Sequence, residues 1–216
     1  MASSWVDEGF IAFDTETTGV DVSEARIVTA AAIVFVGRQP VETDSWLIKV
    51  DVPIPEVTTA VHGITDEMSQ RDGLDQGEAL ADIRRVLTAR NLPVVCFKSD
   101  FDLPILNANL ARVALAPLPI TDVCAYVIDK QFNKYVRGKN QRRLKPTAER
   151  YGIELSEDAW HGAEADALVA GRIFLAEVDA YPEISLTDAQ ELAAKIARWR
   201  DEQDRDFQEW LARQPK

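Results

Sequence analysis

The sequence is poor in cysteine and histidine and has no long apolar run. Its two cysteines, Cys96 and Cys124, lie in apolar surroundings without the close spacing of a zinc site or of a secreted disulfide framework, so we expect reduced core residues. No segment approaches the ~18 consecutive apolar residues of a transmembrane helix, and the acidic start of the chain lacks the basic and apolar regions of an export signal. These absences predict a cytoplasmic protein without a membrane partner.

The chain also has no excess of basic residues: acidic residues outnumber them, and the formal net charge is −12. This charge argues against indiscriminate binding to nucleic acid, because long-range repulsion opposes it. The segment 130–150 departs from the rest of the chain, with eight basic residues and one acid. On charge alone the segment is a solvated helical face, whereas in a nuclease it would contact phosphates.

Apolar periodicity predicts an α/β fold in which a mixed sheet has helices on both faces. The apolar content of 46% is enough for a full core in one domain with an appendage. Three strands come first, with a turn at 37–40 between the second and the third, and strands alternate with helices afterwards. The predicted strands are residues 10–14, 27–36, 44–50 and 93–97, with a short segment at 119–123, and the predicted helices are 76–90, 101–113, 123–131, 145–151 and 164–179.

A break at Tyr181-Pro182 separates this domain, residues 8–180, from a C-terminal amphipathic helical appendage at 185–216. Apolar residues recur in the appendage at helical spacing amid charge. They are Leu192, Ile196, Trp199, Phe207, Trp210 and Leu211. The appendage either packs back on the domain or offers its tryptophans to a partner, and we expect the first.

Acidic residues stand at the ends of predicted strands and at the starts of predicted helices. Asp14 and Glu16 close the first strand, and alternation along an extended strand sends both side chains to one side. Asp102 begins the helix that follows the strand at 93–97. The five-residue spacing of His161 and Asp166 puts an imidazole and a carboxylate at the mouth of another helix. Each feature alone also fits a solvated edge, a helix cap or an exposed loop histidine.

Together, four carboxylates and a histidine make up the set needed for two-metal hydrolysis of a phosphodiester. Oxygen ligands select hard cations such as Mg²⁺ or Mn²⁺ rather than zinc. Two such ions ~3.5–4 Å apart activate a water and stabilise the leaving oxygen, and a histidine can take the proton from that water. We therefore predict a hydrolase that depends on these ions.

Four short motifs give the chain a resemblance to a known family. They are FDTETTG at 13–19, VHGIT at 61–65, DFDLPIL at 100–106 and H-x4-D at 161–166. In this order and spacing they resemble the DEDD superfamily of 3′→5′ exonucleases, histidine subtype, of the kind found as the proofreading epsilon subunit of bacterial DNA polymerase III. The resemblance spans residues 8–180 and implies a ribonuclease H-like fold with a five-stranded mixed sheet.

The resemblance also implies a role for each residue of the catalytic set. Asp14 would bridge two metal ions, and Glu16 and Asp166 would hold the ion on the nucleophile side with it. Asp102 would help to hold the second ion, and His161 would be the general base. The implied cofactors are two Mg²⁺ or Mn²⁺ ions.

Contacts to the substrate are implied in the same way. The residues concerned are Thr17, Thr18 and Gly19 at the sugar end of the terminal nucleotide, His62, Gly63 and Ile64 beside its base, and Phe101 near the departing nucleotide. For His62 the alternative is a side chain that supports the turn, and for Phe101 it is a core aromatic. One departure from the family is Phe97-Lys98, where His-Asn or Tyr-Asn is usual. We hypothesise that Lys98 points to a substrate phosphate.

The leading prediction is a metal-dependent 3′→5′ exonuclease that releases nucleoside 5′-monophosphates from single-stranded DNA ends, in proofreading with a DNA polymerase or in repair. The basic residues predicted to follow the strand behind the terminal nucleotide are Arg137, Lys139, Arg142 and Arg143. Trimming of RNA is an alternative, because sugar discrimination depends on contacts to the 2′-hydroxyl that the sequence does not resolve. A non-catalytic module that docks on a polymerase through the C-terminal helix is another. The oligomeric state stays open.

Overall fold

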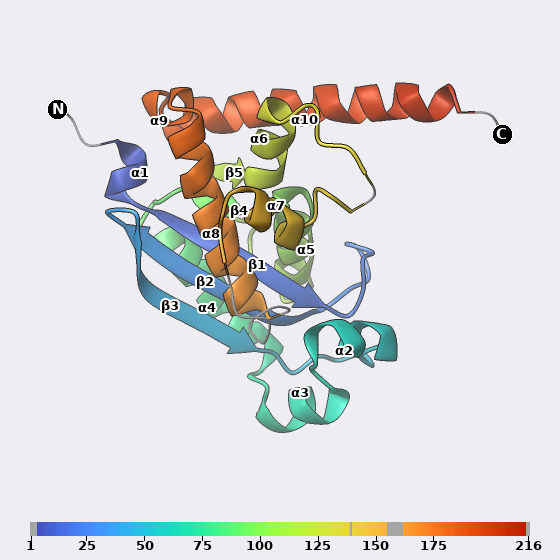
Figure 1. Ribbon diagram of the computed structural model, residues 1–216. Coiled ribbons are helices and arrows are strands. Elements are labelled where there is room, and N and C mark those ends of the chain that lie inside the picture. The colour runs from blue at the N-terminus through green and yellow to red at the C-terminus, as the bar shows by residue number, and fades with distance from the viewer. Residues whose placement is uncertain (1–3, 139, 155–161, 215–216) are drawn as a thin grey trace.

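A five-stranded mixed sheet forms the centre of the fold (Figure 1). The computed structural model describes residues 4–138, 140–154 and 162–214. In the strand order β3-β2-β1-β4-β5, β2 is antiparallel to β1 and β3, whereas β4 is parallel to β1 and β5. The strands are β1 (Phe10–Thr17), β2 (Ile27–Val36), β3 (Gln39–Leu47), β4 (Val94–Cys96) and β5 (Asp122–Cys124). The predicted α/β class and five-stranded mixed sheet are confirmed.

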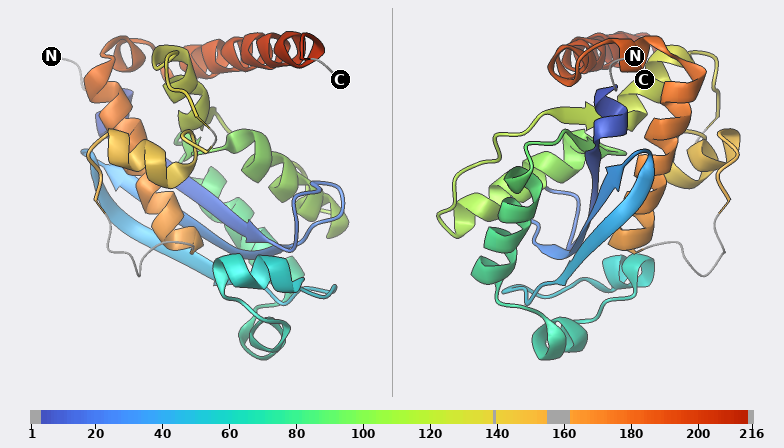
Figure 2. Two further views of the ribbon diagram at one scale, coloured as in Figure 1. Left: turned by 45° about the vertical axis from the view of Figure 1, so that its right-hand side comes forward. Right: turned by 90° about the vertical axis from the view of Figure 1, so that its left-hand side faces the viewer.

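Helices cover both faces of this sheet, as the alternation of apolar segments predicts. α4 (Gln76–Ala89) and α5 (Ser99–Arg112) lie on one side, and α8 (Ala163–Ala180) lies on the other (Figure 2). The other helices of the described residues are α1 (Trp5–Glu8), α2 (Glu56–His62), α3 (Asp66–Asp72), α6 (Ala125–Phe132), α7 (Leu144–Arg150), α9 (Glu183–Leu186) and α10 (Ala189–Ala212).

The central strand β1 supplies side chains to the hydrophobic cores on both faces. Ile11 and Phe13 belong to the cluster under α4 and α5, whereas Phe10 and Ala12 belong to the cluster under α8. Successive residues of a strand point to opposite faces, so an unbroken apolar run is required of a strand that is covered twice. This run also fixes the direction of the acidic residues that follow it.

The two cysteines are buried and free, as predicted, and they lie on β4 and β5. Within the part of the chain that the structure describes, no helix combines the length and the apolar character needed to cross a membrane.

Five elements differ from the sequence prediction, since β3 is displaced and the short helices α1, α2, α3 and α9 were not predicted. β3 runs over Gln39–Leu47 rather than 44–50, and a two-residue turn at Gly37 and Arg38, with φ of 56° and 66°, joins it to β2. β3 is an edge strand with most residues exposed, so it lacks the apolar alternation that marks a strand in the sequence. The short helices α2 and α3 were not predicted, because each buries a single side chain, His62 and Ser69.

Gly171 allows α8 to approach the sheet closely. A Cβ atom at this position would lie 2.6 Å from the ring of Phe35 and 3.1 Å from Cβ of Ala12. Gly171→Ala is therefore expected to lower the free energy of unfolding by about 1–3 kcal/mol, because overpacking forces the elements apart. Urea unfolding measures this loss, with Gly19→Ala as the control, since a Cβ atom there meets nothing within 4 Å. Equal stability of both variants would contradict the close approach.

α10 begins on the core and ends away from it. Leu192 and Ile196 are fully buried in the cluster under α8, and Trp199 packs against the same cluster. The last turns extend along the edge of the molecule toward the C-terminus (Figure 1). Exposed apolar residues on these turns are Phe207, Trp210 and Leu211. The expectation that the appendage packs back on the domain is thus confirmed for the first half of α10.

Candidate metal centre

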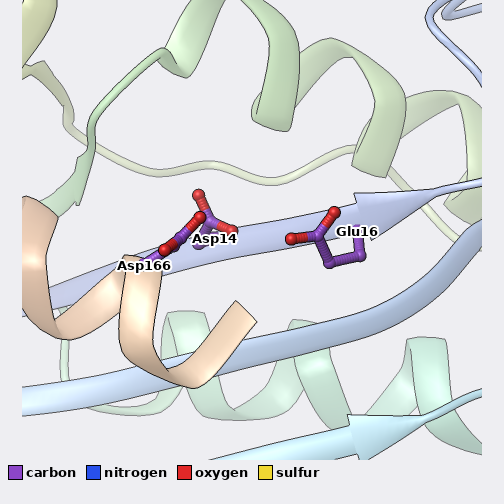
Figure 3. Close-up of side chains that lie close together, drawn as sticks. All are labelled: Asp14, Glu16 and Asp166. Carbon is purple, nitrogen blue, oxygen red and sulfur yellow. The ribbon is translucent and has the colours of Figure 1, made fainter. Parts of the chain in front are cut away.

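Asp14 and Glu16 lie on the same side of β1, near its C-terminal end (Figure 3). Both side chains are half-buried, while Phe13 and Thr15, which alternate with them, are buried on the other side of the strand. This confirms the predicted alternation. The pair stands where an open α/β sheet places its ligands, at the carboxyl end of a central strand.

α8 brings a third carboxylate to this pair. Asp166 lies in the first turn of the helix, where its N–H donates to the Gly162 carbonyl at 3.0 Å. One carboxylate oxygen from each of Asp14, Glu16 and Asp166 lies within 4.8 Å of the other two. Figure 3 shows Asp166 beside Asp14, with Glu16 farther along the strand.

The fourth predicted acid, Asp102, lies near this group without being part of it. It sits in the first turn of α5 and is 3% exposed. The hydroxyl of Thr15 donates to its Oδ1 at 2.8 Å. Asp102 is close enough to raise the pKa of Asp14 by charge repulsion. The structure therefore brings three of the four acids into one cluster and holds Asp102 at its border.

Burial and mutual repulsion raise the pKa of these carboxyl groups. Burial is the largest cause for Asp14, whose pKa lies well above its usual value, and Asp102, Asp166 and Glu16 add to the effect. The pKa of Glu16 is raised to about 7 by burial and then by Asp166. Burial also raises the pKa of Asp102 to about 7, although hydrogen bonds from Thr15 oppose the shift.

This donor set fits a divalent cation. Carboxylates that repel each other in a partly desolvated site are stabilised when a cation neutralises them. Oxygen-only donors are typical of hard ions. The raised pKa values and the oxygens within 4.8 Å of one another are the two observations that support the fit.

A hollow of about 500 Å³ lies against the carboxylates. All four acids border it, together with Lys98 and Phe101 of the predicted substrate-binding residues. Val20 and Val61 also border the hollow and are 88% and 54% exposed. The sequence analysis missed both valines. The signal that could have found them is an apolar residue at the end of a motif, because Val20 directly follows FDTETTG and Val61 is the first residue of VHGIT.

The stretch after β1 uses its threonine side chains to hold its own backbone. The hydroxyl of Thr17 donates to the Gly19 carbonyl at 2.7 Å, and the hydroxyl of Thr18 accepts from the Arg26 N–H at 2.9 Å. Both threonines are buried. Contact between this stretch and a substrate stays a prediction.

The residues His62, Gly63 and Ile64 are outside the lining of the hollow. Nδ1 of His62 accepts from the Ile64 N–H at 3.1 Å, and burial lowers the pKa of the imidazole. Gly63 ends α2 with φ of 76°, a conformation that glycine adopts without strain. Ile64 packs on a small buried cluster. This geometry favours the turn-supporting interpretation of His62.

His161 and Lys139 lie outside the described residues, so the roles predicted for them stay predictions. Among the described residues of the basic segment, Arg142 forms an ion pair with Asp129 at 2.9 Å. Arg137 and Arg143 are exposed.

The mixed sheet, with carboxylates converging from β1, α5 and α8, defines the class of metal-dependent nucleases with a ribonuclease H-like fold. A family model described as an exonuclease, RNase_T, matches residues 11–174. The chain belongs to this exonuclease family. Family membership and the acidic cluster together indicate dependence on a divalent metal ion.

The relatives include subunits of bacterial replicative polymerases. The chain is 32% identical over 165 residues to the DNA polymerase III subunit epsilon of Treponema pallidum, covering 76% of this chain and 74% of the relative. It is 27% identical over 173 residues to the PolC-type DNA polymerase III of Mycoplasma genitalium, covering 78% of this chain and 11% of that relative.

Solved structures share the fold. E. coli exonuclease I in complex with single-stranded DNA matches with a TM-score of 0.71 at 18% identity, over 82% of this chain and 41% of that one. The chain thus corresponds to less than half of exonuclease I and to a small part of the PolC-type polymerase.

Proposed function

We propose that this protein is a metal-dependent 3′→5′ exonuclease that hydrolyses phosphodiester bonds at the 3′ ends of single-stranded DNA, in proofreading or repair, and releases nucleoside 5′-monophosphates. The observation that carries the proposal is the convergence of Asp14, Glu16 and Asp166, with ligand oxygens within 4.8 Å of one another. The exonuclease family and the likeness to an epsilon subunit support it.

Two Mg²⁺ or Mn²⁺ ions are the proposed cofactors. Asp14, Glu16 and Asp166 would hold the first ion, and Asp14 with Asp102 would hold the second. When bound, the ions supply Lewis acidity that activates a water and stabilises the charge of the leaving oxygen. The Thr15 hydroxyl, 2.8 Å from Oδ1 of Asp102, fixes the orientation of that carboxylate.

The remaining groups orient the reactants and move the proton. His161 is the proposed general base, because it precedes Asp166 by five residues and an imidazole titrates near neutral pH. Lys98 and Phe101 border the hollow, where they are proposed to contact a phosphate and the departing nucleotide.

The terminal nucleotide, which is the one that departs, is proposed to extend from Phe101 to the far rim of the hollow. There the stretch 17–19 approaches its sugar, and the end of α2 at 62–64 supports the wall beside its base. Val20 and Val61, both exposed, offer apolar surface to that base.

A polymerase partner and a cytoplasmic location are part of the proposal. The name of the Treponema relative, a subunit of DNA polymerase III, supports the partner. We divide the chain into a nuclease unit at 8–180 and an appendage at 185–216. A non-catalytic docking function is favoured by one observation, the exposed side chains of Phe207 and Trp210 on the appendage.

The test is degradation of one single-stranded DNA oligonucleotide labelled at either its 3′ or its 5′ end, with Mg²⁺, Mn²⁺ or EDTA. We expect shortening from the 3′ end that requires the metal ion. Asp14→Ala is expected to abolish it, because the proposed metal site loses one of its three clustered carboxylate ligands. A matched RNA oligonucleotide tests the alternative substrate in the same series.

Three results would contradict the proposal. Shortening that persists in EDTA or in Asp14→Ala would mean that another site or a contaminant performs the reaction. Faster degradation of the RNA than of the DNA would replace proofreading with RNA trimming. A folded but inactive wild-type protein would leave the docking function as the better explanation.

A further inference from the structure

A second hollow adjoins the candidate metal centre. Its volume is about 550 Å³, and it lies between α5, α6 and the segment that leads into α7. Phe97, Lys98 and Leu144 border both hollows, so the two share a wall. Sites that bind drug-sized ligands have volumes of ~300–1,000 Å³. The second hollow is therefore large enough for one nucleotide.

The charge of this hollow is opposite to that of the metal centre. Among the described residues that line it, three are basic and none is acidic: Lys98, Arg142 and Arg143 are the basic ones. The whole chain has a net charge of −12. A hollow whose described lining contains no acidic residue, directly beside a group of carboxylates, attracts phosphate.

Buried ion pairs hold the wall of the hollow in place. Asp129 is 0% exposed and bonds Arg142 at 2.9 Å and Arg150 at 2.7 Å. Arg142 also donates to the Asn133 carbonyl at 2.7 Å. Glu177, also buried, lies near Asp129 and Arg150, and burial together with Asp129 raises its pKa well above the usual value. The protonated form of Glu177 leaves one carboxylate against two guanidinium groups, and thus a local positive charge on a fixed wall. Arg142 is therefore a structural part of the wall, while the exposed Arg143 is available to a ligand.

The lining also offers flat apolar surface. Phe97 is buried and meets the ring of Tyr126 edge-on, with 6.0 Å between the centroids. The Lys98 ammonium lies 5.0 Å from the centroid of the Tyr126 ring. An aromatic ring beside cationic groups is the combination that binds the base and the phosphate of single-stranded nucleic acid.

We propose that this hollow binds the nucleotide that precedes the 3′-terminal one in a single DNA strand. The inference rests on the proposed function. The phosphate lies between Lys98 and Arg143, and the base lies against Tyr126 and Leu144. The strand enters through the second hollow, whose described lining has no acidic residue. Its terminal nucleotide crosses the wall that the two hollows share and so reaches the carboxylates of the metal centre.

The consequence is a dependence of the reaction on the length of the substrate. The p-nitrophenyl group of a single-nucleotide ester takes the place of the preceding nucleotide but offers neither its phosphate nor its base to the second hollow, whereas a longer strand offers both. Binding energy from such a remote contact raises kcat/KM only for the longer substrate. The two substrates used are the p-nitrophenyl ester of thymidine 5′-monophosphate and an eight-residue oligothymidylate.

The variant that tests the inference is Arg143→Gln, because its side chain is exposed and the fold does not depend on it. Arg85→Gln is the matched control, with the same change of net charge on α4, across the sheet. The readout is the ratio of kcat/KM for the oligonucleotide to kcat/KM for the ester. We expect this ratio to fall on the order of tenfold in Arg143→Gln, as for loss of a charged hydrogen bond, and to stay at the wild-type value in Arg85→Gln.

Equilibrium binding tests the inference without hydrolysis. In Ca²⁺, fluorescence anisotropy of the labelled oligonucleotide should show weaker binding by Arg143→Gln and a salt slope lower by about 0.7, the value for one phosphate of a single strand. Unchanged ratio and unchanged binding would overturn the inference, even if the ester is hydrolysed. An equal loss of affinity for thymidine 5′-monophosphate would overturn it too, since the hollow would then hold the released product. Hydrolysis of neither substrate by the wild type, with weaker oligonucleotide binding in the variant, would overturn only the proposed activity.

Discussion

Glu16→Gln is expected to stabilise the metal-free protein at pH 8 while it removes nuclease activity. The pKa of Glu16 is raised to about 7 by burial and by Asp166. At pH 8 the side chain of Glu16 is therefore ionised, although the folded state favours its protonated form. Glutamine carries no charge, so Glu16→Gln removes this cost to the folded state. After allowance for partial exposure, we expect a gain of about 1–2 kcal/mol in the free energy of unfolding. A loss of activity on the order of 10²–10³-fold accompanies it, because a metal ligand is lost.

The sign of the pH dependence follows from the direction of the shift. A raised pKa in the folded state means that folding favours the protonated form, so the metal-free wild type is relatively more stable at acid pH. This advantage is lost as the pH rises from 4.5, the usual pKa of a glutamate side chain, to about 7, the pKa of Glu16 in the folded protein. The gain from Glu16→Gln should therefore be full at pH 8 and should shrink toward pH 5.

Urea unfolding in EDTA, followed by tryptophan fluorescence at pH 5.5 and pH 8, measures this difference. Glu202→Gln on α10 is the control, because Glu202 is exposed, and we expect a change within about 0.5 kcal/mol. Mg²⁺ at pH 8 should stabilise the wild type more than Glu16→Gln, since binding to the folded state adds stability. A variant that is less stable than the wild type at pH 8 would contradict the assignment of the acids to a metal site.

The parts of the fold that the sequence predicts are those with a strong apolar period. Such elements bury at least one face, and their ranges agree with the prediction within a few residues; they are β1, β2, α4 and α5. Elements that pack little were misplaced or missed. β3 is exposed along most of its length, and α3 depends on local capping, in which Thr65 accepts from the Met68 N–H at 3.2 Å. Such local polar contacts leave no periodic signal.

The candidate site was predictable to the extent that strand and helix geometry fixes it. Alternation places Asp14 beside Glu16, and the first turn of α8 supplies Asp166. The position of Asp102 at the border depends on a hydrogen bond from Thr15, a contact across 87 positions of the sequence. The second hollow is equally hidden, because Asp129 pairs with Arg142 and Arg150, while Arg143 stays exposed. A count of charged residues in the sequence does not distinguish the paired Arg142 from the exposed Arg143.

Removal of α10 is expected to unfold the protein or make it insoluble, whereas removal of its last turns is not. Leu192 and Ile196 are each 1% exposed within the cluster under α8. Loss of one buried leucine or isoleucine side chain costs about 2–5 kcal/mol, so loss of two approaches the total stability of a domain, about 5–15 kcal/mol. Arg200 adds a link to the site, since it donates to Ser99 Oγ at 2.8 Å, at the start of the helix that contains Asp102.

Two truncated chains separate the roles of α10. A chain that ends at Asp188 loses all of these contacts, whereas a chain that ends at Arg205 keeps them and loses Phe207, Trp210 and Leu211, which are 44–53% exposed. Circular dichroism and the yield of soluble protein should differ sharply between the two. The chain that ends at Arg205 should retain the wild-type melting temperature within a few degrees and its nuclease activity. A folded, active chain ending at Asp188 would contradict a structural role for the helix. If the last turns are dispensable for folding, the stacked rings of Phe207 and Trp210, with centroids 5.9 Å apart, are free to contact another molecule.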